Sequence, residues 1–142
     1  MSGATKVATA TRGTDGLDGD SVRRVVAVTA LLGIAVIHLM DAPDKFEEVP
    51  YIGWLFVGLI VACLVLAEML TRRDDARAWL AAGIIAGATI LGYTLSRSVG
   101  LPGEGGEEVG NWKEALGLAS LMIEGVVVWL AARRLLQRAA TT

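Results

Sequence analysis

Residues Tyr51–Ala67 read YIGWLFVGLIVACLVLA, a run of seventeen residues without a charged side chain. A helix rises about 1.5 Å per residue and the hydrocarbon core of a bilayer is about 30 Å thick, so roughly 20 mostly apolar residues cross it. Extended to Thr71, the segment reaches that length. Its first turn holds Tyr51 and Trp54, aromatic residues that are typical of the lipid–water interface. The segment is therefore predicted to be a transmembrane helix.

Three further segments have the same character, and none shows the two-residue alternation of a half-buried strand. They are Val25–Met40, Ala78–Leu95 and Ala115–Ala132. With their flanking residues, the four predicted spans are about 24–42, 51–71, 77–97 and 112–132. The sequence thus predicts an all-α fold, an integral-membrane antiparallel four-helix bundle that occupies residues 23–138.

The two ends of the chain lie outside this predicted domain. Residues 1–22 are rich in Thr, Gly, Ala and Asp without periodicity, which predicts a disordered cytoplasmic tail. Residues 139–142 are predicted to form a short second tail. The first span could also be a cleaved signal peptide, but Met40 and Ala42 make a poor cleavage site and the segment before it is unusually long. A retained helix is the better interpretation.

Basic residues are divided unevenly between the two predicted sides of the membrane. Ten Lys and Arg residues lie on the side of the two termini, and three lie on the other side, namely Lys45, Arg97 and Lys113. Because basic residues mark the cytoplasmic face, both termini are predicted to lie inside, in a bacterial plasma membrane. Eight acidic residues lie on the predicted outer side, where they would concentrate cations. They are Asp41, Asp44, Glu47, Glu48, Glu104, Glu107, Glu108 and Glu114.

Both outer connectors carry strong turn signals. Pro43 and Pro50 disfavour helix in the residue before each, so Asp41–Pro50 is predicted to be a loop. The connector Ser96–Gly110 contains five glycines and one proline. Trp112, a second interfacial anchor, is predicted to open the fourth helix.

Two acidic residues, Glu68 and Glu124, lie well inside the predicted spans, away from the predicted outer side. Glu124 lies about 3 Å from the midpoint of its span by the helical rise. A carboxylate at this depth costs several kcal/mol unless it is protonated or paired, so Glu124 is a candidate for proton or ion handling. The alternative is a protonated Glu124 that donates a hydrogen bond to a nearby carbonyl. Glu68 lies one turn before Arg72, and pairing with that base explains it without a function.

His38 is the only histidine and lies about 7 Å from the midpoint of its span, toward the predicted outer side. An imidazole beside carboxylates is a possible site for a divalent metal ion. The predicted ligands are His38, Asp41, Asp44, Glu47 and Glu48. A haem with His38 as axial ligand is less favoured, because the sequence holds no attachment motif. The structural alternative is a hydrogen bond from His38 to Asp41 or to a backbone carbonyl. Gly92 and Gly117 are predicted to lie at the same depth, where they leave space either for a ligand or for close packing of the helices.

Arg97 closes the third predicted span and is surrounded in sequence by outer acidic residues. It is predicted to pair with Asp41, Glu48 or Glu114 and so to clamp the two outer connectors together. Binding of an anionic substrate by Arg97 is the alternative.

Several segments, taken together, resemble a group of small four-helix membrane proteins of actinobacteria. They are His38-Leu39, APDKFEE at 42–48, PYIG at 50–53, LSRSVGLPG at 95–103 and GNW at 110–112. The resemblance covers Val25 to about Arg134. It implies a multi-pass membrane location and an actinobacterial source, and it implies no activity.

Three functions stay open from the sequence. The first is a non-enzymatic membrane protein that binds a cation or small ligand at an acidic outer mouth. The second is an accessory subunit whose small-residue faces, such as Gly83 and Gly87, pack against a larger complex or a second copy. The third is a small proton- or ion-coupled transporter or channel that uses Glu124.

Enzyme chemistry is the least favoured reading. The sequence shows no paired nucleophile and base, no phosphate-binding loop and no multi-histidine motif, and the single cysteine, Cys63, excludes an intrachain disulfide. Membrane lipids are the expected partners, and no nucleic acid is expected.

Overall fold

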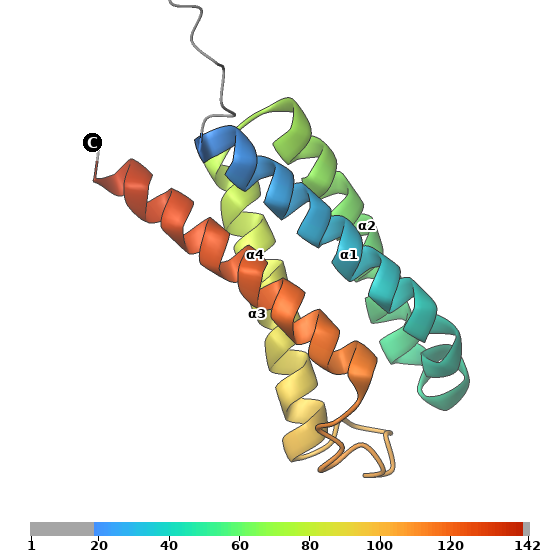
Figure 1. Ribbon diagram of the computed structural model, residues 1–142. Helices are drawn as coiled ribbons and strands as arrows, with labels where there is room; N and C mark the ends of the chain where they lie inside the picture. The colour runs from blue at the N-terminus through green and yellow to red at the C-terminus, as the bar shows by residue number, and fades with distance from the viewer. Residues whose placement is uncertain (1–18, 141–142) are drawn as a thin grey trace, which may run out of the picture.

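The computed structural model describes residues 19–140, and these form four α-helices that run up and down in sequence order. The helices are α1 (Gly19–Glu48), α2 (Pro50–Arg72), α3 (Ala76–Ser98) and α4 (Ala115–Ala139). Figure 1 shows them as two hairpins, α1 with α2 and α3 with α4. Each helix is long and apolar enough to cross a membrane. The chain is therefore a polytopic membrane protein with four candidate spans, and the predicted all-α bundle is confirmed.

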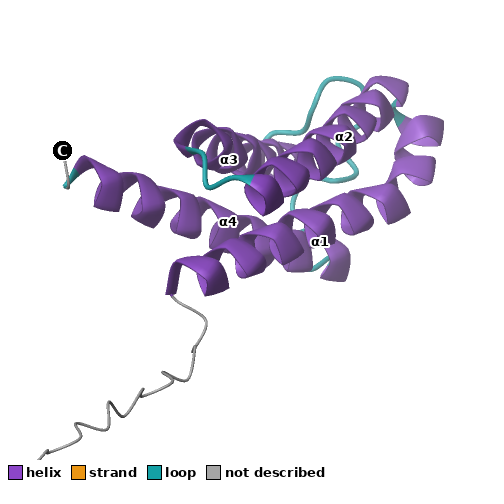
Figure 2. Cartoon of the chain, turned by 90° about the horizontal axis from the view of Figure 1, so that it is seen from above, coloured by secondary structure: helices purple, strands orange, loops and turns teal. Residues whose placement is uncertain are grey.

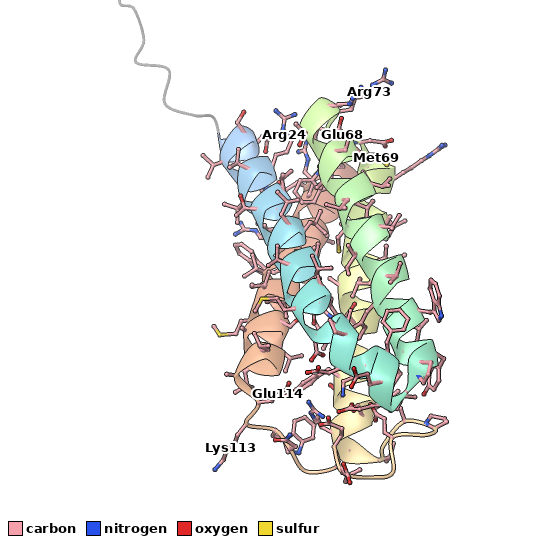
Figure 3. All side chains as sticks on the ribbon, turned by 90° about the vertical axis from the view of Figure 1, so that its right-hand side faces the viewer. Arg24, Glu68, Met69, Arg73, Lys113 and Glu114 are labelled. Carbon is pink, nitrogen blue, oxygen red and sulfur yellow. The ribbon has the colours of Figure 1, made fainter. Side chains whose placement is uncertain are left out.

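The bundle has two different ends. The termini end holds the start of α1, the α2–α3 connector and the end of α4, and the loop end holds the α1–α2 junction and residues 99–114 (Figure 1). In Figure 3, Arg24 and Arg73 lie at the termini end, whereas Lys113 and Glu114 lie at the loop end, with Lys113 pointing away from the bundle.

The outward faces of all four helices are apolar. Val36, Leu55, Ile84 and Met122, one from each helix, are all more than half exposed in the isolated chain. Large exposed apolar surfaces of this kind are expected where helices contact lipid. Seen from above in Figure 2, α1 and α4 lie on one side and α2 and α3 on the other. Of the neighbouring pairs, α2 and α3 pack together most loosely.

The hydrophobic core fills the half of the bundle nearer the termini end. Its fully or almost fully buried members include Ala27, Leu31, Ile34, Cys63, Leu66, Leu70, Trp79, Ala82, Val127 and Ala131. Small residues let the helices approach closely in this half. A side chain on Gly83, for example, would place its Cβ 3.0 Å from the Cβ of Ala131 on α4.

Asp74 ties the termini end together. Its carboxylate pairs with Arg134 and Arg138 of α4, and it accepts a hydrogen bond of 2.6 Å from the indole nitrogen of Trp79. Arg23 of α1 bonds to Gln137 of α4 at 2.8 Å. These contacts join the first and last helices to the α2–α3 connector at the termini end, next to the core.

The α1–α2 junction is much tighter than the sequence predicts. The predicted loop over Asp41–Pro50 is wrong, because α1 continues to Glu48 with Pro43 inside it. Pro43 removes one backbone donor from the helix. An ion pair of 2.7 Å between Lys45 and Glu48, and a 3.0 Å hydrogen bond from the Val49 amide to the Lys45 carbonyl, hold the turns that follow.

Pro50 behaves as its chemistry predicts. Val49, the single residue between the helices, has φ −143° and ψ 84°, outside the helical region that a following proline disfavours. Pro50 then occupies the first turn of α2, where a missing amide hydrogen costs nothing. Phe46 and Trp54 meet edge to face across the corner, with ring centres 5.4 Å apart.

The other helix boundaries differ slightly from prediction. Trp112 does not open the fourth helix, because α4 begins at Ala115, after a turn in which the Trp112 amide bonds to the Gly110 carbonyl at 3.0 Å. Residues 19–22 of the predicted tail form the first turn of α1, and Ala139 of the second tail ends α4. Residues 1–18 and 141–142 lie outside the described residues.

Candidate functional site

A cavity of about 460 Å³ lies in the loop-end half of the bundle, beyond the core. All four helices and the 99–114 loop form its wall, which is mostly apolar and includes Ile52, Phe56 and Leu59 of α2 and Ile85 of α3. The volume falls within the roughly 300–1,000 Å³ that is typical of small-molecule sites. We refer to it as the loop-end cavity, and it is the candidate functional site.

His38 of α1 lines this cavity and is 6% exposed. Its Nδ1 lies 2.9 Å from the carbonyl oxygen of Ile34, one turn earlier, and its ring meets Phe56 edge to face at 4.7 Å. Of the two structural alternatives for His38, the hydrogen bond to a backbone carbonyl is therefore the one observed. A carbonyl only accepts, so Nδ1 carries the hydrogen, and in the neutral ring Nε2 is left as an acceptor.

Glu124 of α4 also lines the cavity and is 1% exposed. The Ser120 hydroxyl, one turn earlier on the same helix, donates to its Oε1 at 2.7 Å. The predicted bond from Glu124 to a backbone carbonyl is not the contact observed. Glu124 thus sits beside the apolar cavity with one oxygen bonded to a neutral hydroxyl.

The five predicted metal ligands do not converge. Asp41 lines the cavity near His38, but Asp44, Glu47 and Glu48 are exposed on the last turns of α1. Between residues 19 and 140, no three histidine, cysteine or acidic side chains lie close enough together to hold one metal ion. Glu48 pairs instead with Lys45. The continuation of α1 past Pro43 explains this, because a helix spreads these carboxylates around its circumference whereas a loop could have gathered them.

Arg97 lies at the rim of the cavity, 5% exposed, where α3 ends. It forms ion pairs with Glu108 and Glu114, and its guanidinium lies 5.0 Å from the centre of the Tyr93 ring. Glu114 is one of its three predicted partners, whereas Asp41 and Glu48 are not bonded to it. Both partners of Arg97 lie in the connector between α3 and α4, so Arg97 does not itself join the two outer connectors. The contact across to α1 is made by Lys45, which pairs with Glu108 at 3.2 Å.

The 99–114 loop is fastened to the helices at several points. The Gly110 amide donates to the Arg97 carbonyl at 2.9 Å, with Gly110 at a φ of 83°, a conformation that favours glycine. Tyr51 of α2 donates to the Pro102 carbonyl at 2.8 Å. Glu104 accepts from the Ser96 hydroxyl at 2.9 Å and from the Leu101 amide at 3.0 Å.

The two glycines predicted to leave space both line the cavity, with different roles. A Cβ on Gly117 would lie 2.4 Å from the Tyr93 ring, so this glycine makes room for the tyrosine. Nothing lies within 4 Å of a Cβ built on Gly92, which therefore borders open space. Only Gly92 leaves room that a ligand could use.

Three residues of the cavity wall, Lys45, Phe56 and Tyr93, are not among the predicted site residues. The hydrogen bond between Ser120 and Glu124 could have been predicted, because residues four apart in a helix lie on the same face. No sequence signal pointed to Lys45 and Glu108, which are 63 positions apart.

No protein-family model matches the chain, and no curated protein or solved structure is significantly similar to it. The resemblance to actinobacterial membrane proteins therefore stays a prediction, and the site is interpreted from its own chemistry.

Proposed function

We propose that this protein is a non-enzymatic membrane protein that binds a small organic ligand in the loop-end cavity. The observation that carries the proposal is the cavity itself: a mostly apolar volume of about 460 Å³ with five buried polar side chains in its wall, among them His38 and Glu124. An apolar pocket with a few polar groups is the usual form of a small-molecule site. A packed bundle without a ligand has no need for such a space, because protein interiors are otherwise close-packed.

An organic ligand fits better than a bare metal ion. A metal site needs several ligands around one point, and the described carboxylates nearest His38 are dispersed along α1. The wall offers instead a long apolar surface from α2 and α3 that can cover a carbon skeleton.

The loop end is proposed to face the cell exterior. Basic residues are concentrated at the termini end, which supports a cytoplasmic position for that end. The dense core between the cavity and the termini end supports access from the loop end or from the adjacent lipid.

A cavity-filling variant tests the proposal. Three probes share a naphthyl body and differ in their head group: naphthylmethylamine, naphthylmethanol and naphthoic acid. Their binding to purified protein in nanodiscs is measured by calorimetry, with empty nanodiscs subtracted. Gly92→Phe fills open space at the wall, and Gly58→Phe is the matched control, because Gly58 has equal room but lies on the outward face of α2.

We expect at least one probe to bind with a stoichiometry of one to the wild type and to Gly58→Phe, and to lose that binding in Gly92→Phe. The absence of stoichiometric binding by all three probes, or equal binding to both phenylalanine variants, would contradict the proposed function.

A further inference from the structure

The charges around the loop-end cavity do not balance. Lys45 and Arg97 are its basic wall residues, and both are already neutralised by ion pairs with glutamates. Four acidic residues line the wall. Glu114 is paired with Arg97, whereas Asp41, Glu104 and Glu124 form no ion pair with any residue of the described chain. Carboxyl groups without an ion pair therefore outnumber free basic groups among the described wall residues.

The wall also offers hydrogen-bond acceptors that have no donor among residues 19–140, which favours a ligand that donates. His38 donates through Nδ1 to the Ile34 carbonyl, so its neutral ring presents an acceptor at Nε2, for which the described residues supply no partner. Glu124 receives the Ser120 hydroxyl on Oε1, and its Oε2 has no partner in that part of the chain. Both side chains are more than nine-tenths buried and both line the cavity. A ligand that satisfies them must donate hydrogen bonds.

The apolar part of the wall also suits a cation. Phe56 and Tyr93 place aromatic rings in the lining, and the faces of such rings attract positive charge, as the position of Arg97 over the Tyr93 ring illustrates. Leu59 and Ile85 supply aliphatic surface that an apolar body would cover.

We infer that the ligand of the loop-end cavity is an amphipathic organic cation, an apolar body that carries a protonated amine, with the ammonium bonded to Glu124 and His38. This inference rests on the proposed function and names the class of ligand. An anionic ligand is disfavoured because it would meet three acidic residues without an ion pair, while the guanidinium of Arg97 is already held by Glu108 and Glu114. A neutral ligand offers no positive charge to pair with the buried Glu124 carboxyl group.

The three naphthyl probes separate these classes, because only the head group changes between them. Glu124→Gln keeps the size of the side chain and an oxygen for Ser120 but removes the charge. Asp41→Asn removes a second acidic group nearer the rim, and it tests the effect of wall charge on amine binding if Glu124→Gln does not fold. Asp44→Asn is the matched control, because Asp44 lies on the same helix as Asp41 but is exposed and outside the cavity wall.

We expect the amine to bind most tightly of the three. Its Kd should rise by roughly tenfold or more in Glu124→Gln and by a smaller factor in Asp41→Asn, because a charge-assisted hydrogen bond or ion pair is lost. The Kd of naphthylmethanol should change less than threefold in every variant, and Asp44→Asn should leave all three values unchanged.

The inference is overturned if the alcohol or the acid binds the wild type as tightly as the amine. It is also overturned if the amine binds with the same Kd to the wild type, to Glu124→Gln and to Asp41→Asn. In either case a probe still occupies the cavity and the proposed function stands. If no probe binds, the proposed function and the inference fail together.

Discussion

A buried arginine organises the rim of the cavity. Arg97 holds Glu108 and Glu114 together although the three residues come from the end of α3 and two separate turns of the loop. Lys45 shares Glu108 and so connects this group to α1. Because the Arg97 side chain is 6% exposed, water compensates little for the loss of either contact.

Arg97→Gln is expected to lower the free energy of unfolding by roughly 2 kcal/mol, because it leaves the part-buried Glu114 without its cation and Glu108 with Lys45 alone. Arg72→Gln is the control. Arg72 pairs with Glu68, but both side chains are more than half exposed, and exposed pairs contribute less than about 1 kcal/mol. Unfolding in mixed micelles with increasing denaturing detergent measures both variants. Equal stability of the two variants would show that Arg97 does not anchor the rim.

At the scale of elements, the α1–α2 corner depends on a close approach between a ring and a backbone. A Cβ on Gly53 would lie 2.6 Å from Cγ of Phe46, whose ring also contacts Trp54. Because Cγ lies on the Cβ–Cγ axis, rotation of the Phe46 ring about that bond would not relieve the contact.

Gly53→Ala is therefore expected to destabilise the protein by roughly 1–3 kcal/mol through overpacking. Gly58→Ala, one and a half turns later on α2 with nothing within 4 Å of its Cβ, is expected to be neutral or slightly stabilising, since alanine favours helix. The same detergent titration compares them. Equal stability of Gly53→Ala and Gly58→Ala would contradict the close contact between Phe46 and the α2 backbone.

Local sequence rules predicted the helices well and their junctions unevenly. Both prolines were predicted to lie in a loop, but Pro43 lies inside α1 and Pro50 begins α2. The rule about residues before proline is a preference of the local backbone, and the contacts of Lys45 with Glu48 and Glu108 oppose it at Pro43. One of those contacts comes from a loop 63 residues away, which no local pattern reveals.

At the scale of the whole molecule, core and cavity occupy opposite halves of the bundle. Hydrophobic run length was enough to predict four helices, because the thickness of a bilayer fixes that length. The helical rise also placed His38, Gly92 and Gly117 at one depth, and all three line the cavity. The cavity itself could not be predicted, because its shape depends on how Tyr93 fills the space beside Gly117 while Gly92 stays open.

The proposed orientation predicts which ends of the bundle react from outside. With Cys63 replaced by serine, Glu107→Cys at the loop end should react with a membrane-impermeant maleimide on intact cells. Arg73→Cys, equally exposed at the termini end, should react only after the cells are permeabilised. The reverse pattern would invert the topology and move the cavity to the cytoplasmic half.

If a ligand can enter the cavity between the helices, a cysteine placed at its wall should react with a small reagent. Gly92→Cys, in the same protein with Cys63 replaced by serine, measures this directly. A small cationic methanethiosulfonate added to intact cells should modify it, and naphthylmethylamine should slow the modification. Gly58→Cys, on the outward face of α2, should stay unmodified because a thiol in lipid does not ionise. Modification of neither cysteine, or of both at equal rates without protection by the amine, would contradict the account.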